Sequence, residues 1–320
     1  FNQIYDFFKK LKSNQALVHK DYLIAINLNE DDIVNHEDSE NIEDVEIDIP
    51  HIKIDNLWEI FSKNAEAIKE DFELLTKNRK SAIPSATNVL INPENIFIEK
   101  DAIVECAVLN ASDGPIYIGK GAEVMEGSLI RGPFALCDNA TLKMASKIYG
   151  ATTIGPYCKV GGEVSNSVFF GYSNKAHDGF LGNSVIGEWC NLGADTNNSN
   201  LKNNYDEVKL WNYPEKKFLP TGLQFCGLIM GDHSKCGINT MFNTGTVVGV
   251  NANIYGHGFQ RNFIPSFAWG SSGTGYTTYQ INKAIEVAEK VYDRRGLKFD
   301  ETEKYILKKI FKLTRQYSLL

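Results

Sequence analysis

An aliphatic or other apolar residue recurs at every sixth position through the middle of this chain of 320 residues. The first unbroken run consists of Ile118, Val124, Ile130, Leu136, Leu142, Ile148, Ile154 and Val160. Phe180, Ile186 and Leu192 form a shorter run, and Met230, Cys236, Phe242, Val248 and Ile254 form a third. A period of six matches neither the 3.6 residues of an α-helical turn nor the two-residue repeat of a strand.

Such a period fits short strands that are joined by tight turns and that each point one apolar side chain inward. The turns need glycine or asparagine, and glycine often follows the apolar position. Three hexads would close one three-sided coil, and stacked coils would pair their backbones in parallel ladders around the aliphatic column. The pattern therefore predicts a mainly β chain built on a parallel β-helix of hexapeptide repeats over residues 85–258.

The two flanking regions have a different texture. Residues 1–84 predict a partial α/β region, with a helix near the start, two short strands in "ALVHKDYLIAINL", an exposed acidic loop over 30–48 and a helix over 57–75. Residues 259–320 predict a helical extension of two amphipathic helices around Gly296. The mild basic excess of these helices indicates a solvated face.

Charge and composition exclude several classes of protein. The chain has 33 Lys and Arg against 40 Asp and Glu, and its net charge of −7 argues against nucleic-acid binding. No export signal is visible in the given sequence, and no apolar run reaches the roughly 20 residues that a membrane span needs. Its six cysteines are scattered without a CxxC pair, which is typical of reduced, packed thiols. We therefore expect a cytoplasmic protein with no nucleic-acid, membrane or metal partner.

One window is more specific than the repeat around it. "KAHDGFLGNSVIGEWCNLGAD", residues 175–195, contains a histidine, two residues, an aromatic residue, Leu-Gly and then I-G-x-x-x-N-L-G-A. This order resembles the acetyltransferase half of the GlmU-like bifunctional sugar-1-phosphate nucleotidyltransferase/acetyltransferases. The [LIV]-G-x-x-x-x hexads likewise resemble left-handed β-helix acyltransferases. The left hand is implied by the resemblance alone, because parallel crossovers generally prefer the opposite hand.

The resemblance implies an acetyl-CoA-dependent transferase that acts on a sugar phosphate or nucleotide sugar as a homotrimer. It gives His177 the role of general base, and an imidazole titrates near neutrality. It gives the backbone N–H of Ala194 the role of oxyanion donor. It also implies that Ala194 contacts the bound acetyl-CoA. Asn191 would orient the substrate. A coil of 17 or 18 residues would stack residues 177 and 194 beside each other.

Other positions depart from the family pattern. Lys143 stands where the family tends to carry a phosphate-gripping arginine, and Phe180 replaces a tyrosine in the sugar site. Ser165 replaces a lysine that contacts phosphate. Lys235 is either a contact to the phosphates of CoA or a solvated lysine. His177 itself could be a turn histidine that bonds to the backbone.

Two alternatives follow from these departures. Ser165 and Phe180 favour a β-helix that performs no chemistry and serves as the trimerisation or regulatory module of a sugar-1-phosphate nucleotidyltransferase. A full-length protein could also transfer nucleotides itself. Residues 1–84 resemble a partial nucleotidyltransferase domain. However, no G-x-G-[TS]-x-x-[RK]-like run follows a strand in residues 1–79, so we expect no such activity from this chain. The segment 195–225 interrupts the hexads and predicts a loop that folds over the site or a neighbouring chain.

Overall fold

The computed structural model describes residues 2–20, 22–28, 42–49 and 51–317, and its contacts divide the chain into two compact units, Phe1–Lys53 and Ile54–Leu320. The first unit contains α1 (Asn2–Phe8), β1 (Gln15–His19), β2 (Tyr22–Asn27) and β3 (Glu43–Glu46). Its sheet has the order β2-β1-β3, with β1 antiparallel to β2 and parallel to β3. The predicted helix and strands are present.

Strand β3 corrects the expectation of an exposed acidic loop over 30–48. Its acidic side chains point outward, while Val45 packs against a small core of Leu11, Leu17 and Ile47. A single inward valine, followed by Ile47, is enough to dock the segment on β1, because alternate side chains of a strand face opposite sides. Residues 30–41 of the predicted loop lie outside the described residues.

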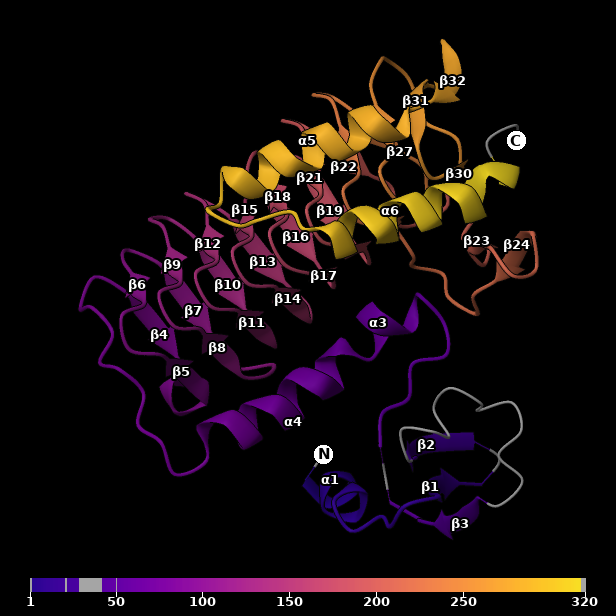
Figure 1. Cartoon of the computed structure of the whole chain (residues 1–320). Coiled ribbons are helices and arrows are strands. Elements are labelled where there is room, and N and C mark those ends of the chain that lie inside the picture. Colours follow the sequence, from indigo (N-terminus) through magenta and orange to yellow (C-terminus); the bar gives the residue numbers. More distant parts are fainter. Residues whose placement is uncertain (1, 21, 29–41, 50, 318–320) are drawn as a thin grey trace. The chain divides into compact units, whose positions relative to one another are not determined.

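The second unit is a three-sided parallel solenoid of the left-handed β-helix class (Figure 1). Face 1 consists of β4 (Val89–Ile91), β7 (Val108–Asn110), β10 (Leu129–Arg131), β13 (Lys147–Tyr149), β16 (Glu163–Ser165) and β19 (Phe180–Gly182). Further along the chain, β22 (Asn197–Asn198) pairs with β27 (Met241–Phe242). The short helical turn η2 (Pro93–Asn95) lies between the first strands.

The other two faces are longer. Face 2 consists of β5 (Ile96–Ile98), β8 (Ile116–Ile118), β11 (Phe134–Leu136), β14 (Thr152–Ile154), β17 (Val168–Phe169), β20 (Val185–Ile186), β25 (Leu228–Met230), β28 (Thr246–Val248) and β30 (Phe263–Ile264). Face 3 consists of β6 (Ile103–Val104), β9 (Glu123–Val124), β12 (Thr141–Leu142), β15 (Lys159–Val160), β18 (Asn174–Lys175), β21 (Asn191–Leu192), β26 (Lys235–Cys236), β29 (Asn253–Ile254), β31 (Ala268–Ser271) and β32 (Gly275–Thr278). The hairpin β31–β32 is antiparallel, and the other pairs of these faces are parallel.

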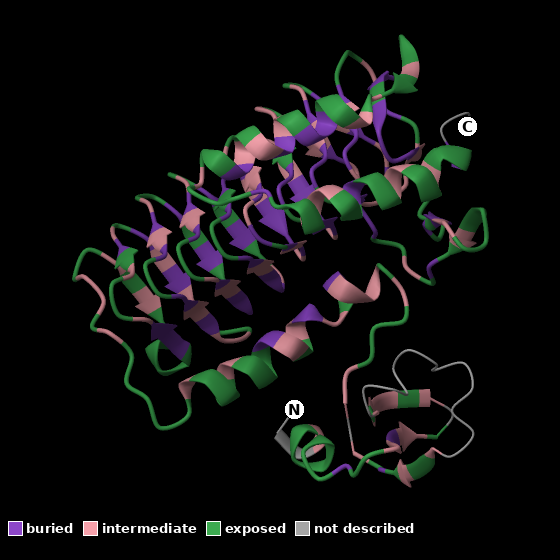
Figure 2. Ribbon diagram, in the orientation of Figure 1, coloured by how far each residue is buried: buried purple, intermediate pink, exposed green. Residues whose placement is uncertain are grey.

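The core of the solenoid is the aliphatic column that the sequence predicts. Every member of the runs from Ile118 to Val160 and from Met230 to Ile254 is buried in one cluster. Phe180 is the exception, because Leu181 takes the inward position and Phe180 lies partly exposed. The strict period fails there since the coils shorten: Val160 pairs with Lys175, only 15 residues further along the chain. Figure 2 shows that buried residues recur along the strands of the solenoid.

Helices α5 (Ile281–Asp293) and α6 (Glu301–Thr314), with the turn η3 (Arg315–Tyr317), are the two predicted C-terminal helices. The predicted start of the helical extension at residue 259 is too early, because β30, β31 and β32 continue faces 2 and 3 as far as Thr278. The carboxylate of Asp300 caps α6 by accepting a hydrogen bond of 3.0 Å from the Glu303 amide. Helix α5 packs on an aromatic column at one corner of the solenoid. Its Tyr292 ring stacks on Trp189 with centroids 4.1 Å apart.

The insertion after β22 contains a hairpin of β23 (Lys209–Asn212) and β24 (Lys217–Pro220). The expectation that it folds over the histidine site is wrong, because the hairpin packs on face 2 of its own solenoid. A contact with a neighbouring chain stays a prediction. Val208, Leu210 and Trp211 are buried there against the outward side chains of β20, β25 and β28. The hairpin packs there because face 2 carries apolar residues that point outward, and burying their aliphatic surface away from water is favourable.

Helices α3 (Glu59–Ser62) and α4 (Asn64–Thr76) fill the region predicted as one amphipathic helix. The amide of Asn64, at the start of α4, donates to the Ala151 carbonyl at 3.0 Å and accepts from Thr153 Oγ1 at 2.9 Å. Asn64 is buried, so both of these bonds satisfy polar groups that water cannot reach. They fix α4 on β14.

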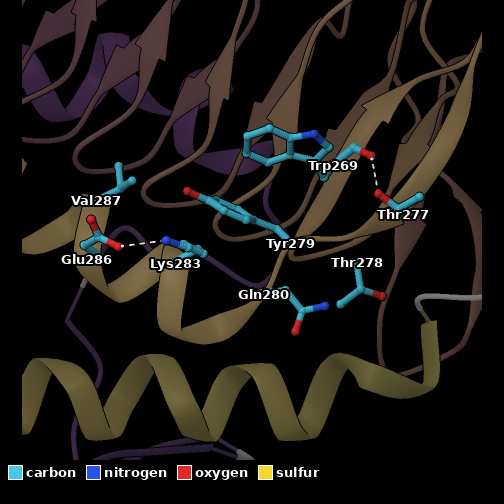
Figure 3. A pocket seen from close by; sticks show the side chains of 8 residues that line it. All are labelled: Trp269, Thr277, Thr278, Tyr279, Gln280, Lys283, Glu286 and Val287. Carbon is cyan, nitrogen blue, oxygen red and sulfur yellow. Dashed lines mark hydrogen bonds and ion pairs between the residues drawn. The ribbon is translucent and has the colours of Figure 1, made fainter.

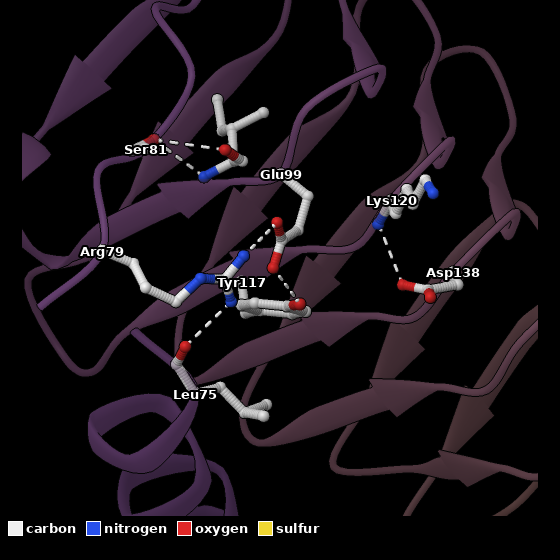
Figure 4. Close-up of polar contacts among 8 residues, drawn as sticks. Leu75, Arg79, Ser81, Glu99, Tyr117, Lys120 and Asp138 are labelled. Atoms are coloured by element: carbon white, nitrogen blue, oxygen red, sulfur yellow. Dashed lines mark hydrogen bonds and ion pairs between the residues drawn. The ribbon is translucent and has the colours of Figure 1, made fainter. Parts of the chain in front are cut away.

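An ionic cluster joins the end of α4 to the first coils (Figure 4). Arg79 Nη2 lies 2.6 Å from Glu99 Oε2, and the Tyr117 hydroxyl donates to Glu99 Oε1 at 2.7 Å. Arg79 also donates to the Leu75 carbonyl at 2.9 Å. Burial raises the pKa of the Glu99 carboxyl, but the hydrogen bonds from Arg79 and Tyr117 outweigh it and leave the pKa below its usual value.

Candidate active site

The corner where face 3 turns toward face 1 carries His177, two residues after the end of β18. The equivalent corner of the next coil carries Ala194, two residues after the end of β21. Asn174 pairs with Asn191, and the Asp195 amide donates to the Asp178 carbonyl at 3.0 Å. This register places residues 177 and 194 at equivalent positions of neighbouring coils, which are separated by about 4.8 Å.

The coil cannot widen at this corner. Gly179 has φ +116°, and a Cβ atom there would overlap the carbonyl oxygen of Thr196 in the next coil. Only glycine fits such a close approach at this backbone conformation. The turn that follows His177 is therefore held tightly against the coil that carries Ala194.

Neither the imidazole of His177 nor the backbone amide of Ala194 has a hydrogen-bond partner among the described residues. The imidazole of His177 is exposed and forms no hydrogen bond with any residue that the structure describes. The Gly193 amide donates to the Cys236 carbonyl at 3.1 Å and the Asp195 amide to Asp178, whereas no described residue accepts from the Ala194 amide. An exposed base and an unoccupied N–H donor thus lie on neighbouring coils.

A lysine lies inside the solenoid beneath this corner. Lys175 occupies the position of Val160 and Leu192 in the aliphatic column and is only 1% exposed. Its Nζ donates to the carbonyls of Gly161 at 3.1 Å and His177 at 3.0 Å. Burial lowers the pKa of the Lys175 ammonium to about 8. The hydrogen bond to His177 fixes the backbone from which the imidazole projects.

Asn191 and Lys235 line a cleft of about 560 Å³ on the outer side of face 3, under the end of α5. We call it the cation-lined cleft, because two lysines and two arginines are among its lining residues. These residues are Lys159, Tyr172, Asn174, Ala176, Trp189, Cys190, Asn191, Lys235, Val291, Arg294 and Arg295. Asn174, Asn191 and Lys235 are in register on successive strands, so their side chains form a row. Ala176 connects the cleft with the corner, since His177 is the next residue.

Lys143 and Phe180 lie near the corner but outside the cation-lined cleft. Thr141 pairs with Lys159 and Lys159 with Asn174, so Lys143 lies at the same edge as His177, two coils earlier. Phe180 projects outward from face 1, with its ring over Gly182. Its backbone N–H donates to Asn197 Oδ1 at 2.7 Å.

Residues 2–80 match the family model of sugar nucleotidyl transferases. No curated protein matches the chain in sequence. Among solved structures, a UDP-N-acetylglucosamine acyltransferase of Francisella novicida is similar at 15% identity and a TM-score of 0.38, covering 71% of this chain and 78% of its own. The polySia-specific acetyltransferase NeuO is similar at 12% and 0.34, covering 64% and 94%. An N-acyltransferase of Bacillus cereus, AntD, solved with dTDP and coenzyme A, is similar at 12% and 0.25, covering 63% and 89%.

The segment that matches sugar nucleotidyl transferases comprises the first unit together with α3 and α4. It contains none of the six predicted site residues, which all lie on the solenoid or at its corners. No group of three or more His, Cys, Asp or Glu able to hold a metal occurs among the described residues. Within the same residues, no helix is long and apolar enough to cross a membrane.

The sequence interpretation missed the residues that close the cation-lined cleft. Arg294 and Arg295 belong to the basic excess that was expected to be a plain solvated face, yet both line the cleft. Tyr172 and Trp189 line it too, and their rings are stacked 4.1 Å apart. The sequence offers one signal for the two arginines, namely their position directly after a predicted helix. Cations are favoured there because they interact with the partial negative charge of the helix C-terminus.

A second cleft, of about 430 Å³, lies at the far end of face 3 between the hairpin β31–β32 and α5 (Figure 3). Trp269 and Tyr279 form its aromatic wall. Its one lysine, Lys283, is paired with Glu286 at 3.3 Å, so this cleft has no excess of positive charge. None of the predicted site residues lines it. The two clefts therefore differ chiefly in charge.

Proposed function

We propose that the chain is an acyltransferase that moves an acyl group, acetyl by preference, from coenzyme A to a sugar phosphate or nucleotide sugar. The observation that carries this proposal is the register of His177 with Ala194 on neighbouring coils, with an exposed imidazole on one and an unoccupied amide on the other. The match of residues 2–80 to sugar nucleotidyl transferases supports a sugar derivative as acceptor.

The reaction needs a base and an oxyanion donor. An amine or hydroxyl of the acceptor attacks the thioester carbonyl, and the imidazole of His177 takes the proton that this group loses. The carbonyl oxygen becomes an oxyanion that accepts a hydrogen bond from the Ala194 amide. When the carbon–sulfur bond breaks, the imidazolium returns a proton to the coenzyme A thiolate, so the site is restored.

The remaining predicted residues would hold the two substrates. Asn191 lies on the strand just before Ala194 and could orient the acceptor through its amide. Lys143 at the same edge could pair with a phosphate, and the outward ring of Phe180 could pack against a sugar. Lys235 is in register with Asn191 on the next strand and could meet the phosphates of coenzyme A. The working form would be a homotrimer.

The test is thioester consumption with acetyl-CoA and a panel of amino sugar phosphates and nucleotide sugars. His177→Ala should lower kcat by about 10²–10⁴-fold, the usual worth of a positioned base. His257→Ala is a matched control, because His257 is also exposed but lies on a different coil. Full turnover by the His177 variant would reject this role for the imidazole.

The competing proposal is a β-helix that only assembles the protein, which the replacements at Ser165 and Phe180 favour. Calorimetry with acetyl-CoA separates the two, since a pure scaffold should give no saturable heat. Light scattering tests the trimer in either case. A monomeric mass would contradict both the scaffold and the trimeric enzyme.

A further inference from the structure

Positive charge is concentrated in the cation-lined cleft, and its lining contains no acidic residue. Lys159, Lys235, Arg294 and Arg295 line it, and no carboxylate is among its lining residues. In the described part of the chain, none of these four cations forms an ion pair, whereas the Lys283 beside the second cleft does. The chain as a whole carries a net charge of −7. An uncompensated cluster of this size in an acidic protein indicates an anionic ligand.

The row on face 3 supplies part of the cluster from a rigid support. Lys159, Asn174, Asn191 and Lys235 follow one another across paired strands, about 4.8 Å apart. Lys235 lines the cleft, and its Nζ donates to the His233 carbonyl at 2.9 Å, which leaves two of its three protons for other acceptors. Burial also lowers the pKa of Lys235, a cost that a bound anion would relieve.

Helix α5 brings the two arginines over this row. Arg294 and Arg295 directly follow the helix, and Arg295 Nη2 lies 3.5 Å from Asn174 Oδ1. Tyr292, two residues before Arg294, packs between Trp189 and Phe299. Cations at a helix end also stabilise the helix by themselves, but that explanation does not extend to the two lysines of the solenoid.

The aromatic side of the cleft offers no free face to a nucleobase. The Tyr172 ring is sandwiched between Tyr157 at 4.9 Å and Trp189 at 4.1 Å, in nearly parallel stacks. Trp189 is in turn covered by Tyr292. Recognition in the cleft therefore depends on phosphate groups, for which guanidinium forks are well suited, and not on base stacking.

We propose that the cation-lined cleft binds the diphosphate group of an organic diphosphate. Two such molecules share this chemistry, namely coenzyme A and a nucleoside diphosphate sugar. Because Ala176 lies in the cleft and His177 follows it, the bound diphosphate would direct the rest of the molecule toward the His177 corner. This last step rests on the proposed acyl transfer, whereas the binding of the diphosphate does not.

The experiment is calorimetry on the full chain with inorganic pyrophosphate, coenzyme A, UDP and UMP, at low and at physiological salt. We expect saturable binding of the three diphosphates, at least tenfold weaker binding of UMP, and weaker binding of all at higher salt. Arg294→Gln/Arg295→Gln should weaken diphosphate binding at least tenfold. Lys283→Gln/Lys290→Gln, on the same helix but paired with Glu286, is the matched control and should bind as the unchanged chain does.

The outcomes separate the two possible sources of the diphosphate. Tight binding of coenzyme A with weak binding of UDP assigns the cleft to the acyl donor, and the reverse assigns it to the acceptor. Absence of saturable heat with all diphosphates, or an equal loss in the control variant, would overturn the proposal. His177→Ala should keep the binding while losing turnover, so diphosphate binding without acyl transfer would reject the proposed function alone.

Discussion

The Nζ atom of Lys175 lies inside the solenoid and donates a hydrogen bond of 3.0 Å to the carbonyl oxygen of His177, whose side chain is on the outside. A second bond, to Gly161, ties the same ammonium to the preceding coil. One buried lysine thus connects the interior column with the corner of the candidate active site. A lysine that replaces an aliphatic residue in such a column bears a desolvation cost, and its two carbonyl partners offset only part of it.

Replacing Lys175 should separate its packing from its hydrogen bonds. Lys175→Met keeps the volume and removes a buried charge, so we expect the free energy of unfolding to change by less than about 2 kcal/mol. Lys175→Ala should lower it by about 2–5 kcal/mol, because a cavity remains. Chemical denaturation measures both. Hydrogen exchange over residues 174–180 should accelerate in Lys175→Met but not in the surface control Lys298→Met. Unchanged exchange would show that the corner does not depend on this ammonium.

The buried His233 should make the protein sensitive to acid. Burial is the main cause that lowers the pKa of its imidazole to about 3, and Lys235 adds to it. Between about pH 6.5 and 3 the unfolded chain binds a proton that the folded chain does not, so stability falls as the pH falls through this window. The slope is at most about 1.4 kcal/mol per pH unit. The free energy of unfolding of the unchanged chain and of His233→Phe, measured by chemical denaturation across this pH window, tests the prediction. Parallel curves for the two proteins would assign the acid sensitivity to other groups.

The cluster of Arg79, Glu99 and Tyr117 should stabilise the first coils at pH values above the pKa of the Glu99 carboxyl. Because its folded pKa lies below the unfolded value, its contribution is present at neutral pH and is lost as the pH falls through the folded pKa. Tyr117→Phe removes one hydrogen bond and keeps the ring, at a cost of about 0.5–1.5 kcal/mol at pH 7. Thermal melts at pH 7 and pH 3 measure the difference. It should shrink at pH 3, and a constant difference would contradict a charge-assisted bond.

The sequence by itself determined the solenoid and the pairing of its corners. A six-residue column of apolar side chains can be buried only by coiling, and a coil of about 17 residues necessarily brings residue 194 beside residue 177. It also determined the C-terminal helices, whose apolar spacing and Gly296 boundary are local features. The error at Phe180 has an equally local cause: a coil shortened after Val160 shifts the inward position to Leu181, and a fixed period cannot follow that change.

Only the tertiary structure decided what surrounds this corner. The row of Lys159, Asn174, Asn191 and Lys235 follows from strand register, but the two arginines that close the cleft stand some sixty residues or more further along the chain. Their position depends on where α5 docks, and that is set by the stacking of Tyr292 on Trp189, a contact that no local pattern encodes. The burial of Lys175 was hidden for the same reason, since a charged residue is assigned outward until its neighbours in space are known.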